Sequence, residues 1–233
     1  MTKLNKITSV LLSAIMVIGI FSIIPFAAGA ETSGNFEYSV LDDGTASIKK
    51  YIDNGSKTVD IPSTIDGYKV TEIGYSAFEG CTGLKSVTIP SSVKEIGYNA
   101  FLGCTGLKSV TIPSSVKEIG DWAFWDCTGL TKITVDKNNK NYTSVDGVLF
   151  NKDKTIILVY PSAKGSSYVI PSSVTYIGKN AFNGCTGLKS VIIPNSVKEI
   201  SSQAFATCTG LKSVTIPNSV TRISWEVFWA VPA

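Results

Sequence analysis

One motif, IPxSVxxIxxxAFxxCTGLKSV, recurs along the chain at a constant step of 23 residues. Cys81, Cys104 and Cys127 are 23 positions apart, and so are Cys185 and Cys208. A constant period of this length is typical of a solenoid, in which each turn buries its apolar face only against its neighbours. The spacing therefore predicts a β-rich solenoid of 23-residue turns.

Within one repeat, the apolar residues mark an inner and an outer face. Side chains alternate along a strand, so the segment LKSVTIP points Val87 and Ile89 inward and Ser86 and Thr88 outward. One Phe recurs at a fixed position of every repeat, which predicts a column of rings in the core. The column comprises Phe78, Phe101, Phe124, Phe182, Phe205 and Phe228.

The five Cys also share one repeat position, which predicts a buried column of free thiols. Successive turns lie about 5 Å apart, so disulfides between neighbouring Cys stay open as an alternative.

Residues 1–30 have the pattern of a secretory signal peptide. Two Lys precede an apolar run, and Ala28-Gly29-Ala30 forms a small-x-small cleavage site. An uncleaved membrane anchor is the alternative. Cleavage leaves 19 basic and 18 acidic residues, a balance that gives no indication of nucleic acid or of an acidic membrane as partner. We expect no stable membrane insertion after cleavage.

The remaining chain divides into a cap and a solenoid. Residues 31–60 alternate apolar and polar residues about an Asp-Asp-Gly turn, which predicts a β-hairpin that caps the first turn. Residues 61–233 hold the solenoid, interrupted by an insertion at about residues 136–168. Two apolar runs flank a polar turn in the insertion, which predicts a second hairpin that protrudes from the surface.

The repeated IPxSVxxIG, AF and GCTGL elements and the inserted NYTSVDGVLFNKDKTIILVYP resemble the BspA-type leucine-rich-repeat family of bacterial surface and secreted proteins. The resemblance extends over nearly all of the chain after residue 30. It implies a right-handed β-rich solenoid used for adhesion, for contact with host or matrix proteins, or for coaggregation. The last repeat departs from the pattern, with Val227 in place of Ala and Val231 in place of Cys.

Catalytic equipment is scarce in this sequence. The chain contains no His, which excludes Ser-His-Asp and Cys-His nucleophilic systems and His-based metal sites. The 23-residue Cys spacing is not that of a zinc site, and no Gly-rich phosphate loop is present. We expect no enzyme activity, no cofactor and no metal. The acidic pair Asp121 and Asp126 leaves a glycan-active enzyme as the third-ranked alternative.

Aromatic residues outside the repeated apolar positions are the candidates for binding. Tyr75, Tyr98, Trp122 and Trp125 fall on consecutive repeats and predict an aromatic edge, unless they pack over the loops between turns. We expect Trp225 and Trp229 to shield the open end of the solenoid. The inserted hairpin adds further candidate ligand-binding residues, namely Tyr142, Asp146, Phe150 and Tyr160.

These observations predict a secreted or cell-surface, non-catalytic binding or adhesion module that contacts an extracellular protein or glycan. The alternative is a structural scaffold, one segment of a larger surface assembly. Self-association through the C-terminal turn stays open, and it would distinguish the scaffold from the binding module.

Overall fold

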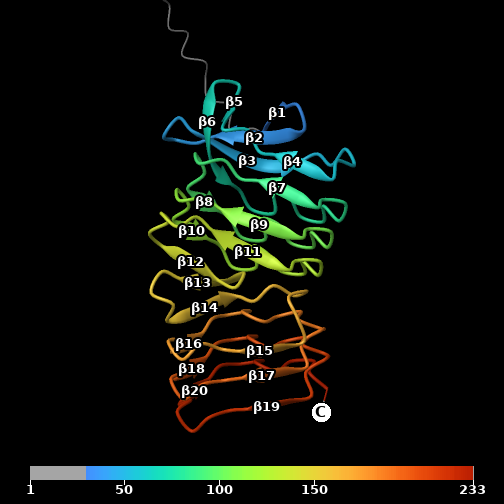
Figure 1. The fold of residues 1–233 in the computed structure, drawn as a ribbon. Helices are drawn as coiled ribbons and strands as arrows, with labels where there is room; N and C mark the ends of the chain where they lie inside the picture. Colours follow the sequence, from blue (N-terminus) through green and yellow to red (C-terminus); the bar gives the residue numbers. More distant parts are fainter. Residues whose placement is uncertain (1–29, 233) are drawn as a thin grey trace, which may run out of the picture.

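A computed structural model describes residues 30–232, so the predicted signal peptide lies, except for its last residue, outside the described residues. This part of the chain contains β-strands and no helix, stacked into an elongated solenoid (Figure 1). The first eleven strands are β1 (Glu31–Ser33), β2 (Phe36–Val40), β3 (Ala46–Tyr51), β4 (Thr58–Asp60), β5 (Thr64–Ile65), β6 (Tyr68–Ile73), β7 (Ser86–Thr88), β8 (Glu95–Ile96), β9 (Ser109–Ile112), β10 (Glu118–Ile119) and β11 (Lys132–Val135). The other nine are β12 (Tyr142–Val145), β13 (Val148–Asn151), β14 (Ile156–Val159), β15 (Ser167–Val169), β16 (Tyr176–Ile177), β17 (Ser190–Ile192), β18 (Glu199–Ile200), β19 (Ser213–Thr215) and β20 (Arg222–Ile223).

Each regular turn contributes one short strand to each of two sheets. Residues 23 positions apart pair in parallel, for example Val87 with Val110 and Ile96 with Ile119. The inward residues of these strands are buried or nearly so, as the alternation predicts. The repeat period therefore equals one turn, which confirms the predicted β-solenoid.

The repeated Phe residues stack in the core as predicted, but in two columns rather than in one. In the first, Phe101 lies between Phe78 and Phe124, with ring centroids 5.0 and 5.6 Å away. In the second, Phe205 lies between Phe182 and Phe228, at 4.8 and 5.5 Å. A Tyr begins each column: Tyr51 stacks on Phe78 at 5.3 Å and Tyr160 on Phe182 at 5.0 Å. Each ring thus buries its faces against the turns before and after it.

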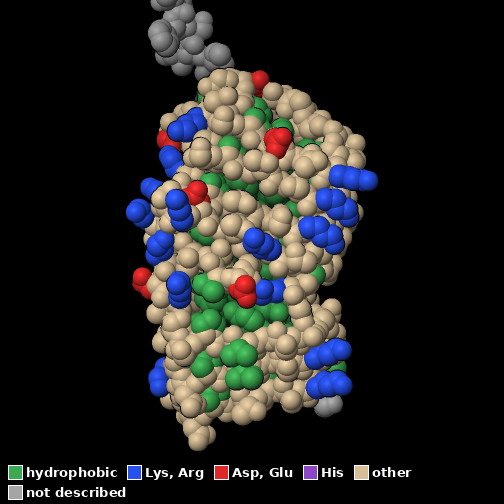
Figure 2. Space-filling view, in the orientation of Figure 1, with side chains coloured by type: hydrophobic (Ala, Val, Ile, Leu, Met, Phe, Trp, Pro, Cys, Tyr) green, Lys and Arg blue, Asp and Glu red, His purple; other side chains and the backbone are tan. Residues whose placement is uncertain are grey.

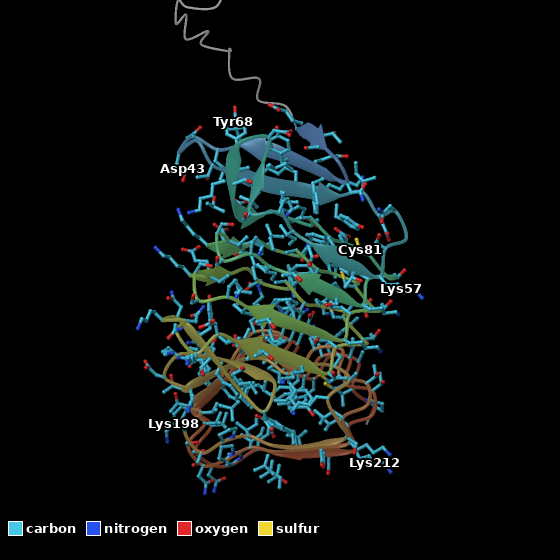
Figure 3. The ribbon with its side chains drawn as sticks, turned by 45° about the horizontal axis from the view of Figure 1, so that its top comes forward. Asp43, Lys57, Tyr68, Cys81, Lys198 and Lys212 are labelled. Carbon is cyan, nitrogen blue, oxygen red and sulfur yellow. The ribbon has the colours of Figure 1, made fainter. Side chains whose placement is uncertain are left out.

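All five Cys are buried free thiols, and Figure 3 shows Cys81 inside the stack. The thiols of Cys104, Cys127 and Cys208 donate hydrogen bonds of 3.0 to 3.1 Å to the carbonyl oxygen of the Phe in the preceding turn. Hydrogen bonding with Cys127 and burial raise the pKa of Cys104. The thiol thus fills a small apolar space and satisfies a buried carbonyl group at once.

Two halves of the molecule share one topology. Residues 31–135 form the first half, whose main sheet has the order β1-β2-β3-β6-β8-β10. Residues 142–232 form the second half, whose main sheet has the corresponding order β12-β13-β14-β16-β18-β20. In each half, three antiparallel strands, which we call the meander, precede strands that stack in parallel.

The glycines of the CTGL motif follow the same division. A Cβ on Gly106, Gly129 or Gly210 would collide with a carbonyl oxygen of the preceding turn. A Cβ on Gly83 or Gly187, in the first regular turn of each half, would meet no atom within 4 Å. Gly is thus required where one turn packs directly on another.

The inserted strands do not protrude from the surface, so the expectation of a protruding hairpin is wrong. Val148, Leu149 and Ile157 are buried, because β14 pairs in parallel with β16 and thereby occupies a place in the stack. The strands β4 and β15 also pair in parallel with strands of the regular turns, β7 and β17. They fall inside the residues that we assigned to the cap and to the insertion, and the domain boundaries stay predictions.

Candidate functional site

The loops that follow the second strand of each regular turn stack along one edge of the solenoid, which we call the loop edge. Backbone hydrogen bonds join neighbouring loops, as from Ser76 N to Tyr98 O (3.0 Å) and from Phe78 N to Ala100 O (2.7 Å). Within the described residues, no such bond joins loop 120–126 to loop 178–184. The ladder is therefore interrupted once, between the two halves. The loops of the edge are residues 74–80, 97–103, 120–126, 178–184, 201–207 and 224–230.

The interruption arises because the second meander contributes a turn without an outer loop. Ile157 pairs with Ile177 across β14 and β16. Tyr160 follows Ile157 by three positions, whereas Phe182 follows Ile177 by five. The chain therefore reaches the core column directly, and Tyr160 N donates to Ala181 O at 2.7 Å. Loops 120–126 and 178–184 face each other across this missing loop, at a place that we call the junction.

Side chains bridge the junction where backbone bonds are missing. Lys179 Nζ lies 2.7 Å from Asp121 Oδ2 and 4.7 Å from the ring centroid of Trp122. Trp125 Nε1 donates a hydrogen bond of 3.3 Å to Asn183 Oδ1. An ion pair, a cation–π contact and one hydrogen bond thus hold the two loops together.

A cavity of about 250 Å³, the junction cleft, lies between the bridged loops. The bridging side chains line it together with core residues of the meander, including Leu149, Leu158 and Tyr160. Burial raises the pKa of Tyr160 to about 12, so its hydroxyl is protonated at neutral pH. The cleft is thus mainly apolar and aromatic, with a few polar groups.

A second depression, the indole groove, has a volume of about 330 Å³ and lies on the same edge. Trp122, Trp125 and Asn183 line both the groove and the cleft. Trp229 also lines the groove and is 57% exposed, so its indole faces this shared surface. Trp225 is 61% exposed and lines neither depression. The groove is lined by Asn99, Trp122, Trp125, Asn183, Gln203, Thr207 and Trp229.

Trp122 occupies a strained backbone position. Its φ is 58°, in the left-handed region that favours Gly and Asn and that bulky residues rarely adopt. A side chain there costs about 1–2 kcal/mol. The equivalent left-handed residues of the other loops are Ser76, Asn99, Asn180, Gln203 and Glu226, all polar and four of them small or amide-bearing. A large indole at this position contributes exposed aromatic surface at the expense of backbone strain.

The predicted site residues separate into three groups. Trp122 and Trp125 lie together, with ring centroids 6.5 Å apart and exposures of 37% and 41%. Tyr75 and Tyr98 are exposed on the same edge but line neither depression. The third group comes from the meander and has mainly structural positions.

Phe150 is 0% exposed and packs in the core, a position that removes it from the candidate site. Tyr160 lines the cleft from inside, in the core column. Tyr142 also lines the cleft, but its hydroxyl accepts a 3.1 Å hydrogen bond from Ile119 N at the open edge of β10. Asp146 is exposed in the turn between β12 and β13, where its φ is 55°.

Several residues of the site were not predicted from the sequence. Asn183, Gln203, Thr207 and Trp229 join the groove from three loops of the second half. Lys179 occupies the same repeat position as Asp121, a correspondence visible only when the two halves are aligned across the insertion. That alignment was the available signal for the ion pair.

The sequence matches the family described as "BspA type Leucine rich repeat region" in six copies, over residues 49–163 and 159–231. The chain belongs to this family. BspA-type leucine-rich repeat proteins are bacterial surface or secreted proteins, typically non-catalytic repeat modules. No curated protein matches the chain.

Solved structures of other bacterial leucine-rich repeat proteins share the fold. The leucine-rich repeat protein TpLRR of T. pallidum is 30% identical, with a TM-score of 0.56, over 84% of this chain and 86% of that one. The pneumococcal vaccine antigen PcpA is 21% identical, with a TM-score of 0.61, over 88% and 80%. A leucine-rich cell surface protein of Faecalibacterium prausnitzii is 23% identical, with a TM-score of 0.56, over 87% and 80%.

Between residues 30 and 232, no helix has the length and apolar character needed to cross a membrane. The same residues contain no group of three or more His, Cys, Asp or Glu side chains placed to hold a metal ion.

Proposed function

We propose that the protein is a secreted or cell-surface binding module that contacts an extracellular protein or glycan through Trp122 and Trp125. One observation carries the proposal: Trp122 keeps an exposed indole at a left-handed position where the other loops have Ser, Asn, Gln or Glu. Residues held in strained conformations gather at functional sites. Exposed indoles are also among the side chains that contribute most to binding energy.

The surroundings of the two indoles support this function. Each indole lines both the junction cleft and the indole groove, so a ligand can contact it from either side. The contacts with Lys179 and Asn183 hold both rings in place before a ligand arrives. Rigid aromatic surface loses little conformational entropy on binding, which favours affinity.

The secreted location rests on the signal-peptide pattern of residues 1–30 and on the surface or secreted character of the family. N-terminal sequencing of exported protein tests it, and we expect Glu31 as the first residue. A membrane-retained protein that still carries Lys3 would contradict secretion.

The loop edge itself supplies matched variants that test the binding surface. Trp122→Asn introduces the residue found at Asn99 and Asn180, and Trp125→Leu introduces that of Leu102. Both changes remove an indole while keeping a residue that a neighbouring loop already accommodates. Trp225→Ser, which introduces the residue of Ser202, removes an exposed indole that lines neither depression and serves as the control.

The chain from residue 31 is screened against arrays of extracellular-matrix proteins and glycans, and the affinity of each hit is measured for the three variants. We expect Trp122→Asn and Trp125→Leu each to weaken binding by about 1–3 kcal/mol, and Trp225→Ser to leave it unchanged. Hits whose affinity is the same in all three variants would place recognition elsewhere on the solenoid.

The alternative of a scaffold segment makes a different prediction. A scaffold self-associates through an end of the solenoid, so its mass rises with concentration whether or not the two indoles are present. Sedimentation equilibrium of wild type and Trp122→Asn distinguishes the functions, and we expect a monomer in both.

A further inference from the structure

We infer that the indole groove is a binding site for a neutral, hydroxyl-rich glycan. The inference rests on the proposed function, because it assigns a ligand class to the surface that holds Trp122 and Trp125. The groove also extends past these two residues to Trp229 in the last loop of the edge.

The charge of the groove limits the ligand. Its lining consists of three indoles, three side-chain amides and one hydroxyl, and none of these carries a formal charge. A groove for nucleic acid or another polyanion needs Lys or Arg along its length. Lys179 is the nearby cation, and it is paired with Asp121 and lines the cleft rather than the groove. The ligand that fits this lining is therefore neutral.

The hydrogen bonds within the groove show what the ligand must offer. Thr207 Oγ1 donates to Asn183 Oδ1 at 2.9 Å, and Gln203 Nε2 donates to Glu226 Oε2 at 2.8 Å. The only donor of Thr207 is therefore used within the protein. Gln203 uses one of its two amide hydrogens in the same way. Acceptor lone pairs remain on Thr207 Oγ1 and Gln203 Oε1. A neutral ligand that satisfies these acceptors and the second Gln203 N–H both donates and accepts hydrogen bonds, as a hydroxyl group does.

The indoles supply flat apolar surfaces for the remaining faces of such a ligand. Trp122 and Trp125 are tilted by 43° to each other, and Trp229 lies at the other end of the groove lining, three loops further along the edge. Aromatic rings spread along an axis suit a chain of several sugar rings, whose C–H faces stack while their hydroxyls bond. A proline-rich peptide also prefers aromatic grooves, but proline has no N–H to donate to the free acceptors.

Two residues of the groove have side chains that disfavour their left-handed backbone conformation. Thr207 has a φ of 54°, although it is β-branched; the equivalent residues of the other loops are Gly80, Gly103, Asp126, Gly184 and Ala230. Trp122 is strained in the same sense, with a φ of 58°. Both side chains line the groove, and bulky or β-branched residues such as these rarely adopt a left-handed conformation.

Asn183 acts as a positioning residue. Its Oδ1 accepts hydrogen bonds from Trp125 Nε1 and Thr207 Oγ1, and its Nδ2 donates to Asn180 Oδ1 at 3.0 Å. One amide thus fixes an indole of the first half and a hydroxyl of the second, and sets the spacing between them.

The test uses the chain from residue 31 and defined soluble probes. The neutral probes are the tetrasaccharides of β-1,4-glucose, α-1,4-glucose, β-1,4-mannose and β-1,4-N-acetylglucosamine; a heparin tetrasaccharide and a decaproline peptide are the comparison probes. Binding is followed by tryptophan fluorescence and calorimetry. We expect saturable binding of at least one neutral tetrasaccharide and none of the heparin fragment or the peptide.

Variants then place the binding in the groove. Trp229→Ala and Thr207→Gly should each weaken saccharide binding by about tenfold or more, which corresponds to about 1.4 kcal/mol. Thr207→Ser keeps the hydroxyl and should bind like wild type, as should Trp225→Ser. Thr207→Gly introduces the residue of three equivalent loops, so its folding is not at risk.

Failure of this inference is separable from failure of the proposed function. Absence of saturable binding by all four neutral saccharides overturns the inference, and so does saccharide binding that Trp229→Ala and Thr207→Gly leave intact. If an extracellular protein binds with dependence on Trp122 and Trp125 while the saccharides do not, the proposed function stands and the glycan assignment fails.

Discussion

The first and second halves of the solenoid have the same order of strands, but their meanders meet different surroundings. In the first half, β1 forms the outer edge of its sheet. In the second half, the chain leading into the meander contacts the segment just before β10 through side chains. Asn139 Nδ2 donates to Pro113 O and Val116 O at 2.8 and 3.0 Å, and Asn141 Nδ2 donates to Lys117 O at 3.0 Å.

This difference shows how a repeat protein can create a site without leaving its fold. Where turns follow the 23-residue period, backbone hydrogen bonds join the neighbouring loops of the edge. Where the meander replaces a regular turn, side-chain contacts take over and a cleft opens between the halves. Side chains vary in size and chemistry, whereas a backbone ladder does not, so the junction is the place where specificity can arise.

The outer strand faces of the two halves differ as well. On β7 and β9, the outward positions hold Thr88 and Thr111. On β15 and β17, Val169 and Ile192 pair in register and are 64% and 61% exposed. Figure 2 shows hydrophobic side chains over these two strands, and Lys and Arg side chains on both flanks of the solenoid. The halves thus share their inward residues and differ in those facing solvent.

Thiol labelling gives the largest expected contrast, because it requires turns to open. Cys104 lies between two neighbouring turns, and its raised pKa keeps it protonated. We expect its labelling in the native state to be slowed by several kcal/mol of opening free energy, with Cys208, near the last turn, opening more easily. Mass spectrometry of time-resolved alkylation measures both rates. Equal and rapid labelling of the two thiols would contradict the buried columns.

The Phe columns give the next largest effect. Phe101 and Phe205 are each stacked between two rings in their respective halves. Replacing either by Ala should lower the free energy of unfolding by about 3–5 kcal/mol. Phe124→Ala should cost less, since Phe124 ends its column and borders the cleft. Urea denaturation measures all three, and a small effect at only one of the two central positions would show that the halves are not equivalent.

The fold could be predicted from the sequence because the repeat period of the sequence equals one turn of the solenoid. A 23-residue step fixes which residues stack, and the alternation in LKSVTIP fixes which of them are buried. The position of the meander could not be predicted in the same way. Residues 148–150 are an apolar run that suits either an exposed hairpin or a buried strand, and only the pairing of β14 with β16 decides between them.

The candidate site could be predicted in part. Trp122 and Trp125 were recognised because they depart from the residues of the equivalent positions. For Trp229 the sequence predicted only that it shields the open end of the solenoid. Its place in the same groove depends on how three loops of the second half stack behind the junction, which the sequence does not show. The cleft itself follows from a difference of two residues between Tyr160 and Phe182 relative to their strands, which has meaning only once the register is known.

Relief of strain at the junction should give a smaller effect of opposite sign. Trp122→Asn places a residue that tolerates the left-handed conformation, and we expect the free energy of unfolding to rise by about 1 kcal/mol. The loss of the cation–π contact with Lys179 offsets part of the gain. Thermal and urea unfolding of Trp122→Asn measure the change in free energy, with Trp225→Ser as the control. A loss of more than about 1 kcal/mol would mean that the indole stabilises the junction rather than serving recognition.

The smallest effect concerns the outer strand face. The double variant Val169→Thr and Ile192→Thr gives the second half the surface of the first, and should change the free energy of unfolding by no more than about 0.5 kcal/mol. Val191→Thr is the matched control, because Val191 lies on β17 with its side chain buried, where the introduced hydroxyl would lack a partner. Differential scanning calorimetry compares the two. A large loss in the double variant would show that the exposed pair contributes to folding.

The junction has a mechanical consequence. A pull along the long axis separates neighbouring turns, and between regular loops it must break a run of backbone hydrogen bonds. Between loops 120–126 and 178–184 it meets only the contacts made by Lys179 and Asn183. We therefore expect the loop edge to separate first at the junction under single-molecule force, while the backbone bonds from Ile133 N to Gly147 O and from Ala163 N to Leu130 O still join the halves. Under load the molecule would then lengthen along its loop edge before the core of either half opened.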